Sequence, residues 1–80
     1  MAWIDNKNGT VTTFDSMHGS VTWTPDFFGI YVSRAGAARR YCERYFTSEE
    51  ALSRRAALDA IAAEHWPGAE FWVSPIRDVP

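Results

Sequence analysis

The capping box Thr47-Ser48-Glu49-Glu50 constrains the fold more than any other feature of this chain. In such a motif the Thr side chain accepts a hydrogen bond from the backbone amide three residues later, and the Glu at that position bonds back to the cap. An alanine-rich stretch follows as far as His65, and Pro67-Gly68 ends it because proline cannot continue a helix. The sequence therefore predicts one main helix between the capping box and His65.

The predicted helix has one face that can cover a sheet. Five residues fall on one side of it at helical spacing: Ala51, Leu58, Ile61, Ala62 and His65. Small alanine side chains let a helix lie close on a sheet, so we expect this face to be buried. Glu50 and Arg54 are four residues apart, and we expect them to form an ion pair on the flank of the helix.

Short runs of β-forming residues, separated by turn residues, fill the chain before the helix. Asn8-Gly9 predicts a two-residue hairpin, because both positions tolerate a positive φ. The run 27–33 is apolar on both faces, which is typical of a central strand. The other runs cover residues 3–5, 10–14, 21–24 and 39–46 before the helix and residues 70–74 after it.

Short turns between successive strands favour antiparallel pairing. Together with the helix they predict an α+β domain in the order ββββαβ, in which an antiparallel sheet of four to five strands has the helix packed on one face. Hydrophobic residues are 46% and charged residues 22% of the chain, as in an ordinary globular protein, so we expect residues 1–80 to form a single domain.

Targeting signals and disulfides do not feature in this sequence. Cys42 is the one cysteine, so no internal disulfide can form. The N-terminal residues have no basic segment followed by a long apolar run, and no stretch approaches the roughly 20 apolar residues of a membrane span. We therefore expect a cytoplasmic protein with no membrane partner.

Residues with catalytic or metal-binding chemistry are present but scattered. Cys42, His18 and His65 lack the spacing of metal ligands. Asp15, Ser16 and His18 lie within one loop, where side chains seldom converge into a nucleophile, a base and an orienting group. The glycines form no phosphate-binding loop. We therefore expect no enzyme activity, no catalytic residue, no metal and no cofactor.

Charge is distributed unevenly along the chain. The net charge is −2, but residues 34–55 hold six arginines against three glutamates, whereas the remainder holds seven acidic and two basic residues. Such a bipolar surface suits a protein partner at least as well as a phosphate backbone. The negative total disfavours direct binding to nucleic acid.

The run 39–46 interleaves arginine with tyrosine, two residue types that are enriched at interface hot spots. Strand alternation puts Tyr41 and Tyr45 on one face, and Arg40 and Arg44 on the other. Two interpretations stay open: a strand that binds a partner, or a strand whose tyrosines pack under the helix. Trp72 is a further binding candidate, because a tryptophan that faces away from a small core needs a cover, which a second copy in a homodimer would supply.

Residues 27–65 resemble the arm-type DNA-binding domain of phage integrases. The two strands of residues 28–33 and 39–46, followed by the capped helix, have the element order of that family of small three-strand-plus-helix modules. The resemblance implies that an arginine-containing sheet face sits in a DNA groove. The residues that would carry this alternative function are Arg39, Arg40 and Arg44.

The whole chain resembles anti-CRISPR proteins of phages and other mobile elements in its size, acidic charge, layout and lack of catalytic motifs. The resemblance implies a non-enzymatic inhibitor that binds a type I CRISPR-Cas effector complex and blocks its binding to target DNA. Carboxylates would then bind the Lys and Arg that normally hold phosphates, and aromatic side chains would anchor the contact. The expected partner-binding residues are Asp5, Asp15, Asp26, Asp59, Glu64, Glu70, Tyr41, Tyr45 and Trp72.

Overall fold

Residues 3–77, which the computed structural model describes, form six strands and one helix. The elements are β1 (Trp3–Asp5), β2 (Val11–Asp15), β3 (Gly19–Trp23), β4 (Phe27–Arg34), β5 (Arg40–Tyr45), α1 (Ser48–His65) and β6 (Ala69–Ile76). The strands pair in two antiparallel sheets with the orders β1-β2-β3 and β5-β4-β6, and α1 packs against the second. The predicted α+β class, with a helix on an antiparallel sheet, is confirmed.

The strands divide between two sheets and five of them precede the helix, whereas the sequence suggested one sheet of four to five strands in the order ββββαβ. Pro25 interrupts the chain between β3 and β4 and has no amide to donate. The amide of the next residue, Asp26, donates to the carbonyl oxygen of Ile76 at 2.9 Å. The chain therefore enters β4 already paired with β6 and not with β3, and β4 becomes the central strand of the second sheet, as its two apolar faces indicated.

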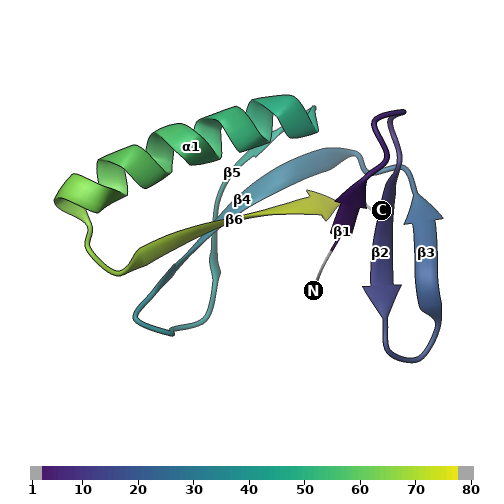
Figure 1. Ribbon diagram of the computed structural model, residues 1–80, viewed down its shortest axis with the longest axis horizontal. Helices are drawn as coiled ribbons and strands as arrows, with labels where there is room; N and C mark the ends of the chain where they lie inside the picture. The colour runs from purple at the N-terminus through teal and green to yellow at the C-terminus, as the bar shows by residue number, and fades with distance from the viewer. Residues whose placement is uncertain (1–2, 78–80) are drawn as a thin grey trace.

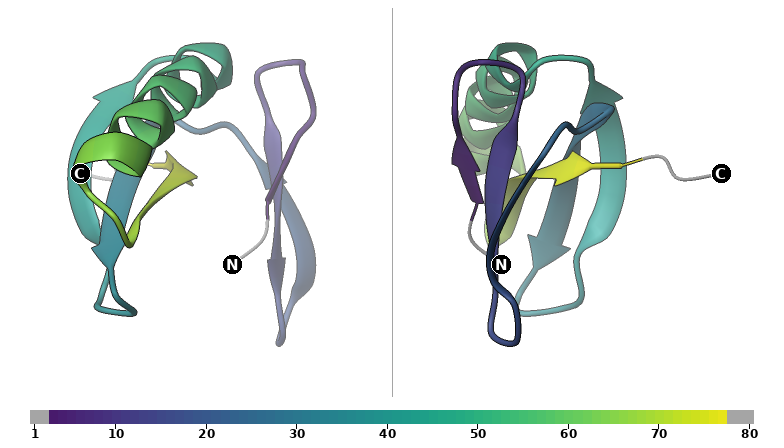
Figure 2. Two further views of the ribbon diagram at one scale, coloured as in Figure 1. Left: turned by 60° about the vertical axis from the view of Figure 1, so that its left-hand side comes forward. Right: turned by 90° about the vertical axis from the view of Figure 1, so that its right-hand side faces the viewer.

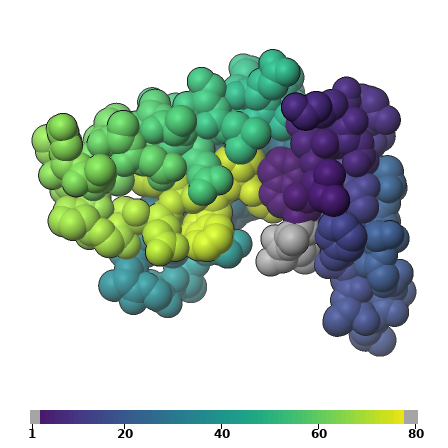
Figure 3. Space-filling view, in the orientation of Figure 1, coloured from purple at the N-terminus to yellow at the C-terminus, as the bar shows by residue number. Residues whose placement is uncertain are grey.

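Both the helix and the first sheet lie on the same side of the second sheet. Figure 1 shows α1 running along the β5-β4-β6 sheet, with the β1-β2-β3 sheet standing beyond the N-terminal end of the helix. The left view of Figure 2 shows α1 and β1-β2-β3 on the same side of β4 and β5. The hairpin of β2 and β3 projects beyond the body of the molecule (Figure 3).

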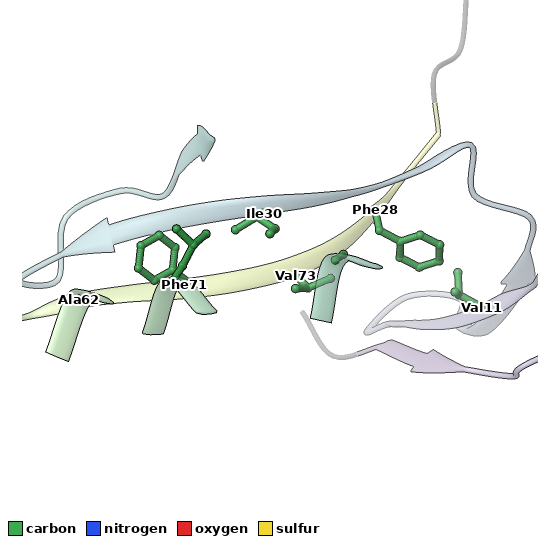
Figure 4. Packing of buried hydrophobic residues seen from close by; sticks show 8 residues of the cluster. Val11, Phe28, Ile30, Ala62, Phe71 and Val73 are labelled. Atoms are coloured by element: carbon green, nitrogen blue, oxygen red, sulfur yellow. The ribbon is translucent and has the colours of Figure 1, made fainter. Parts of the chain in front are cut away.

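The core fills the space between these layers. Phe28 and Ile30 of β4 are buried with Phe71 and Val73 of β6, and α1 covers them with Ala51, Leu58 and Ala62. Val11 of β2 is fully buried next to Phe28 (Figure 4). The first sheet thus closes the part of the core that the helix does not reach, and each large apolar side chain buried there contributes about 1.5–3 kcal/mol.

Trp3 ties the first strand to the last. Its ring lies 5.7 Å from that of Phe28, centroid to centroid. Its Nε1 donates a hydrogen bond of 2.8 Å to the carbonyl oxygen of Val73, on the edge of β6 that β4 does not use. Pro75 further along β6 has no amide to offer a new strand. Together these two residues restrict strand addition at this edge.

The predicted helix is confirmed at both ends, but its buried face is smaller than expected. Thr47 Oγ1 accepts from the Glu50 amide at 3.2 Å and donates to the Glu50 carboxylate at 3.0 Å. Ile61 is 39% exposed and the His65 ring lies in solvent, so neither belongs to the buried face. Within residues 3–77 no helix is long and apolar enough to cross a membrane.

Two local predictions are wrong in detail. Arg54 pairs with Glu43 of β5, Nε to Oε1 at 2.7 Å, and not with Glu50, because the sheet brings Glu43 beside the helix. The first hairpin has a three-residue loop, since the Asn6 amide bonds to the Thr10 carbonyl at 3.1 Å. The residues with positive φ in that loop are Lys7 and Gly9.

Candidate functional site

A β-bulge at Cys42 decides which side chains of β5 face the solvent. Ile30 pairs with Glu43 but Tyr31 pairs with Tyr41, so Cys42 is an extra residue without a partner on β4. Every side chain on the N-terminal side of the bulge changes face relative to simple alternation. The predicted grouping of Tyr41 with Tyr45 is therefore wrong: the two rings lie on opposite faces of the sheet.

The bulge helps to create an aromatic and basic surface, which we call the outer face: the side of the β5-β4-β6 sheet that is turned away from α1. No helix or strand within residues 3–77 covers it, and residues Tyr41 and Phe46 are 53% and 75% exposed. Cross-strand pairing and ring contacts assign the residues of the outer face: Phe27, Tyr31, Ser33, Arg39, Tyr41, Arg44, Phe46, Glu70, Trp72, Ser74 and Ile76.

Two arginines of the outer face lie over aromatic rings. The guanidinium carbon of Arg39 is 3.8 Å from the centroid of the Trp72 ring. That of Arg44 is 4.2 Å from the centroid of Phe27. Both distances are within the range of cation–π attraction. Each arginine is thereby held in place before any partner arrives, which reduces the entropy lost on binding.

The remaining aromatic side chains also hold one another. Tyr31 and Tyr41 meet edge to face at 5.8 Å between centroids. Phe46 packs on Phe27 at 5.4 Å. The indole Nε1 of Trp72 donates to Ser33 Oγ at 3.2 Å. The outer face is a packed set of side chains and not a row of independent ones.

The charge on the outer face is not neutralised from within the described chain. No carboxylate of residues 3–77 lies within ion-pair distance of Arg39 or Arg44, whereas Arg54 and Arg55 on the helix pair with Glu43 and Asp59. Arg44 stands opposite Gly29, and Arg39 comes just before Arg40, which pairs with Val32. The backbone positions of the two arginines are therefore about four residues apart along the sheet, or about 13 Å.

Gly29, on the central strand β4, leaves room on the outer face for two neighbouring side chains. A Cβ atom added there would lie 2.5 Å from Cδ1 of Ile76 and 3.1 Å from Cε2 of Tyr31. The missing side chain lets those two residues lie over the backbone of β4. A larger residue at this position would lift them from the sheet.

The structure divides the arginines predicted for DNA binding. Arg39 and Arg44 share the outer face, but Arg40 pairs with Val32 and lines a cavity with it on the helix side. Among the predicted partner-binding residues, Tyr41, Trp72 and Glu70 also lie on the outer face. One surface thus unites residues from both predicted sites.

Tyr45 lies on the core side of the sheet, opposite Phe28, and not on the outer face. Its ring is half-buried against the core, and its hydroxyl donates to Glu43 Oε1 at 3.0 Å. Burial and the Glu43 carboxylate raise the pKa of this hydroxyl. The interpretation in which a tyrosine packs under the helix thus holds for Tyr45, while Tyr41 is exposed on the outer face.

The predicted acidic site is not assembled on one surface. Asp5, at the end of β1, accepts hydrogen bonds from the Ser48 hydroxyl and the Lys7 amide, which lower the pKa of its carboxyl group. Asp15, at the end of β2, accepts from the Met17 amide at 2.8 Å and lies 3.1 Å from the His18 ring, and both contacts lower its pKa.

The other predicted carboxylates lie elsewhere. Asp59 is on α1, 3.7 Å from Arg55, and Glu64 is near the C-terminal end of the same helix. Asp26 precedes β4, and its amide bonds to Ile76. Within residues 3–77 no three His, Cys, Asp or Glu side chains are grouped so that they could hold a metal ion.

Sequence reasoning missed the contribution of Phe27, Phe46, Tyr31 and Gly29 to the outer face. Alternation in the run 27–33 already put Phe27 and Tyr31 opposite the core residues Phe28 and Ile30. The face of Tyr41 depends on the bulge, for which the sequence has no local signal.

Neither a protein-family model, nor a curated protein, nor a solved structure matches this chain.

Proposed function

We propose that this protein is a non-enzymatic binding protein that docks on another protein through its outer face. The observation that carries the proposal is the pair of arginines held over Trp72 and Phe27 on a sheet face that no described element covers. Trp, Tyr and Arg are the residues that most often dominate interface energies, and Phe and Arg are enriched in interface cores. Phe46 and Ile76 add apolar area at the end of the same face.

The charge of the outer face specifies the chemistry of its partner. Arg39 and Arg44 have no carboxylate partner within residues 3–77, so a complex that buries them must supply an acidic group to each. A carboxylate that meets an arginine already stacked on a ring forms a charge-assisted hydrogen bond without further loss of side-chain freedom. We therefore propose an acidic patch on the partner protein opposite the two arginines.

The proposed partner is a type I CRISPR-Cas effector complex, and the proposed effect is that it no longer binds target DNA. The resemblance of the chain to anti-CRISPR proteins in size, charge and layout supports this choice. Docking through the outer face would leave α1, with Glu64 near its C-terminal end, pointing away from the docked surface. That carboxylate would then repel the phosphates of incoming DNA, in addition to the steric block.

A gel shift of labelled target duplex by a purified type I effector complex tests the proposal. With the protein present, the shift should be lost, and the protein alone should shift no DNA. An unchanged effector shift at a saturating excess of the protein contradicts the proposed inhibition. The same lanes at two salt concentrations separate specific docking from weak charge attraction.

A second candidate function is direct DNA binding through the same face. The observation that favours it is that Arg39 and Arg44 project from a three-stranded sheet whose other side carries a helix, which is the arrangement that the likeness to integrase arm-type domains implies. In that case the protein alone shifts the duplex, and its affinity falls steeply as salt is raised.

A further inference from the structure

A cavity of about 240 Å³ lies on the opposite side of the same sheet, between the C-terminal half of α1 and strands β4, β5 and β6. Its walls are mainly apolar and include Val32, Leu58, Trp66 and Phe71. The left view of Figure 2 shows this end of the molecule, where α1 leads into β6 and β4 turns into β5. The cavity shares no residue with the outer face, so a ligand here is independent of the proposed function.

The bulge and the helix sequence explain why this space is unfilled. The bulge turns both Cys42 and Glu43 towards the helix side, where they line the cavity. The buried face of α1 offers only Leu58 between the small residues Ala51 and Ala62. Neither element supplies a large side chain to fill the gap between them.

The two charged residues that line the cavity, Glu43 and Arg34, differ in the partners they have within the described chain. Glu43 is already occupied, because its Oε1 accepts from Arg54 at 2.7 Å and from the Tyr45 hydroxyl at 3.0 Å. Arg34 also lines the cavity, and no carboxylate within residues 3–77 lies within ion-pair distance of it. An apolar space with one unneutralised guanidinium group is complementary to a small molecule with an apolar body and one negative charge.

We propose that this cavity binds a small aromatic carboxylate, whose ring packs between Leu58, Trp66 and Phe71 and whose carboxylate pairs with Arg34. The volume is below the roughly 300 Å³ at which drug-sized sites begin, so the ligand has one or two rings and not more. A ligand of that size is expected to bind with a Kd on the order of 1 mM or somewhat below.

Titration of the isotope-labelled full chain with 2-naphthoate, followed by NMR, tests the site. Saturable shifts are expected at the amides of Cys42, Leu58 and Phe71. The Arg34→Gln variant should bind about tenfold more weakly, because it loses a charged hydrogen bond. Arg44→Gln, which changes an arginine on the outer face, is the matched control and should bind as the wild type does. The neutral 2-naphthalenemethanol should bind the wild type and the Arg34→Gln variant equally weakly.

The thiol of Cys42 supplies a second readout, since it is the one cysteine in the chain and is exposed. Saturating 2-naphthoate should slow its alkylation by iodoacetamide several-fold. The proposal is overturned if no saturable shifts appear, if the shifts centre on Trp72 and Phe27, or if alkylation is unaffected at saturation. Equal affinity of the wild type and Arg34→Gln for 2-naphthoate would also overturn it.

Discussion

The guanidinium group of Arg39 lies over the indole ring of Trp72, with 3.8 Å between its central carbon and the ring centroid. The ring nitrogen of the same indole, Nε1, donates a hydrogen bond to Ser33 Oγ on the neighbouring strand. Trp72 is thus fixed by β4 and in turn fixes an arginine from the turn before β5. This chain of contacts gives an exposed charge a defined position on the outer face.

The outer face should be sensitive to bulk at Gly29. A Gly29→Val variant places side-chain atoms where Ile76 and Tyr31 now lie, so the ring and the aliphatic chain must move. We expect a loss of about 1–3 kcal/mol in the free energy of unfolding, measured with urea. Ser74→Val, at the position opposite Gly29 on β6, is the control and should cost less than about 0.5 kcal/mol. Equal losses for the two variants would contradict the close packing over Gly29.

Trp3 should be essential to the joining of the two sheets. Trp3→Phe keeps a ring against Phe28 but removes the donor to the Val73 carbonyl. We expect a loss of about 1–2 kcal/mol in the free energy of unfolding. Hydrogen exchange should show earlier opening of β1 and β2 than of β4. A variant with unchanged exchange in β1 and β2 would show that this hydrogen bond does not hold the first sheet in place.

The contact of Asp5 with Ser48 predicts a pH-dependent part of the stability. Because hydrogen bonds from Ser48 and Lys7 lower the pKa of Asp5 in the folded protein, the unfolded chain binds more protons in the acid range. This stabilisation is fully present above the pKa of the unfolded chain, about 4, and is lost as the pH falls through the lower folded value.

Ser48→Ala tests that contact. It should reduce the free energy of unfolding by about 1 kcal/mol at pH 7, where Asp5 is charged, and by less at pH 3. Ser53→Ala, at an exposed position of α1, serves as the control and should show no such difference between the two pH values. A Ser48→Ala loss that is the same at both pH values would contradict the assignment.

The protein should not form a homodimer through its outer face. A two-fold contact there would bring together two copies of a face that carries Arg39 and Arg44, on which Glu70 is the one acidic residue among those described in 3–77. We therefore expect a monomer of 9.1 kDa in light scattering at low salt. A dimer that Trp72→Ala dissociates would contradict this expectation and would support a second copy as the cover of Trp72.

The parts of the fold that the sequence predicts are those fixed by neighbouring residues. Thr47 and Glu50 form the cap by themselves, and Pro67-Gly68 ends the helix without help from the sheet. The split into two sheets depends on a bond between Asp26 and Ile76, which are 50 residues apart and belong together only in the folded chain. No local pattern indicates that bond.

The candidate site was only partly predictable for the same reason. Arg39, Arg44, Tyr41 and Trp72 stood out by residue type. Which of them share a surface depends on the bulge at Cys42, a shift in the pairing of β5 with β4 that the residues of β5 do not indicate by themselves. The predicted acidic site was not found on one surface, because the number of carboxylates in a sequence does not indicate which of them lie close together in the folded chain.

Charge reversal on the outer face tests the central claim most directly. The effector gel shift would compare three proteins: the wild type, the outer-face variant Arg39→Glu/Arg44→Glu, and a control variant. The control, Lys7→Glu/Arg55→Glu, has the same change in net charge. We expect the wild type and the control to abolish the shift of target duplex. The outer-face variant should need at least about 100-fold more protein for the same effect, because it loses two residues that dominate the binding energy. Circular dichroism would confirm that all three proteins are folded. Equal inhibition by the outer-face variant and the wild type would contradict the account.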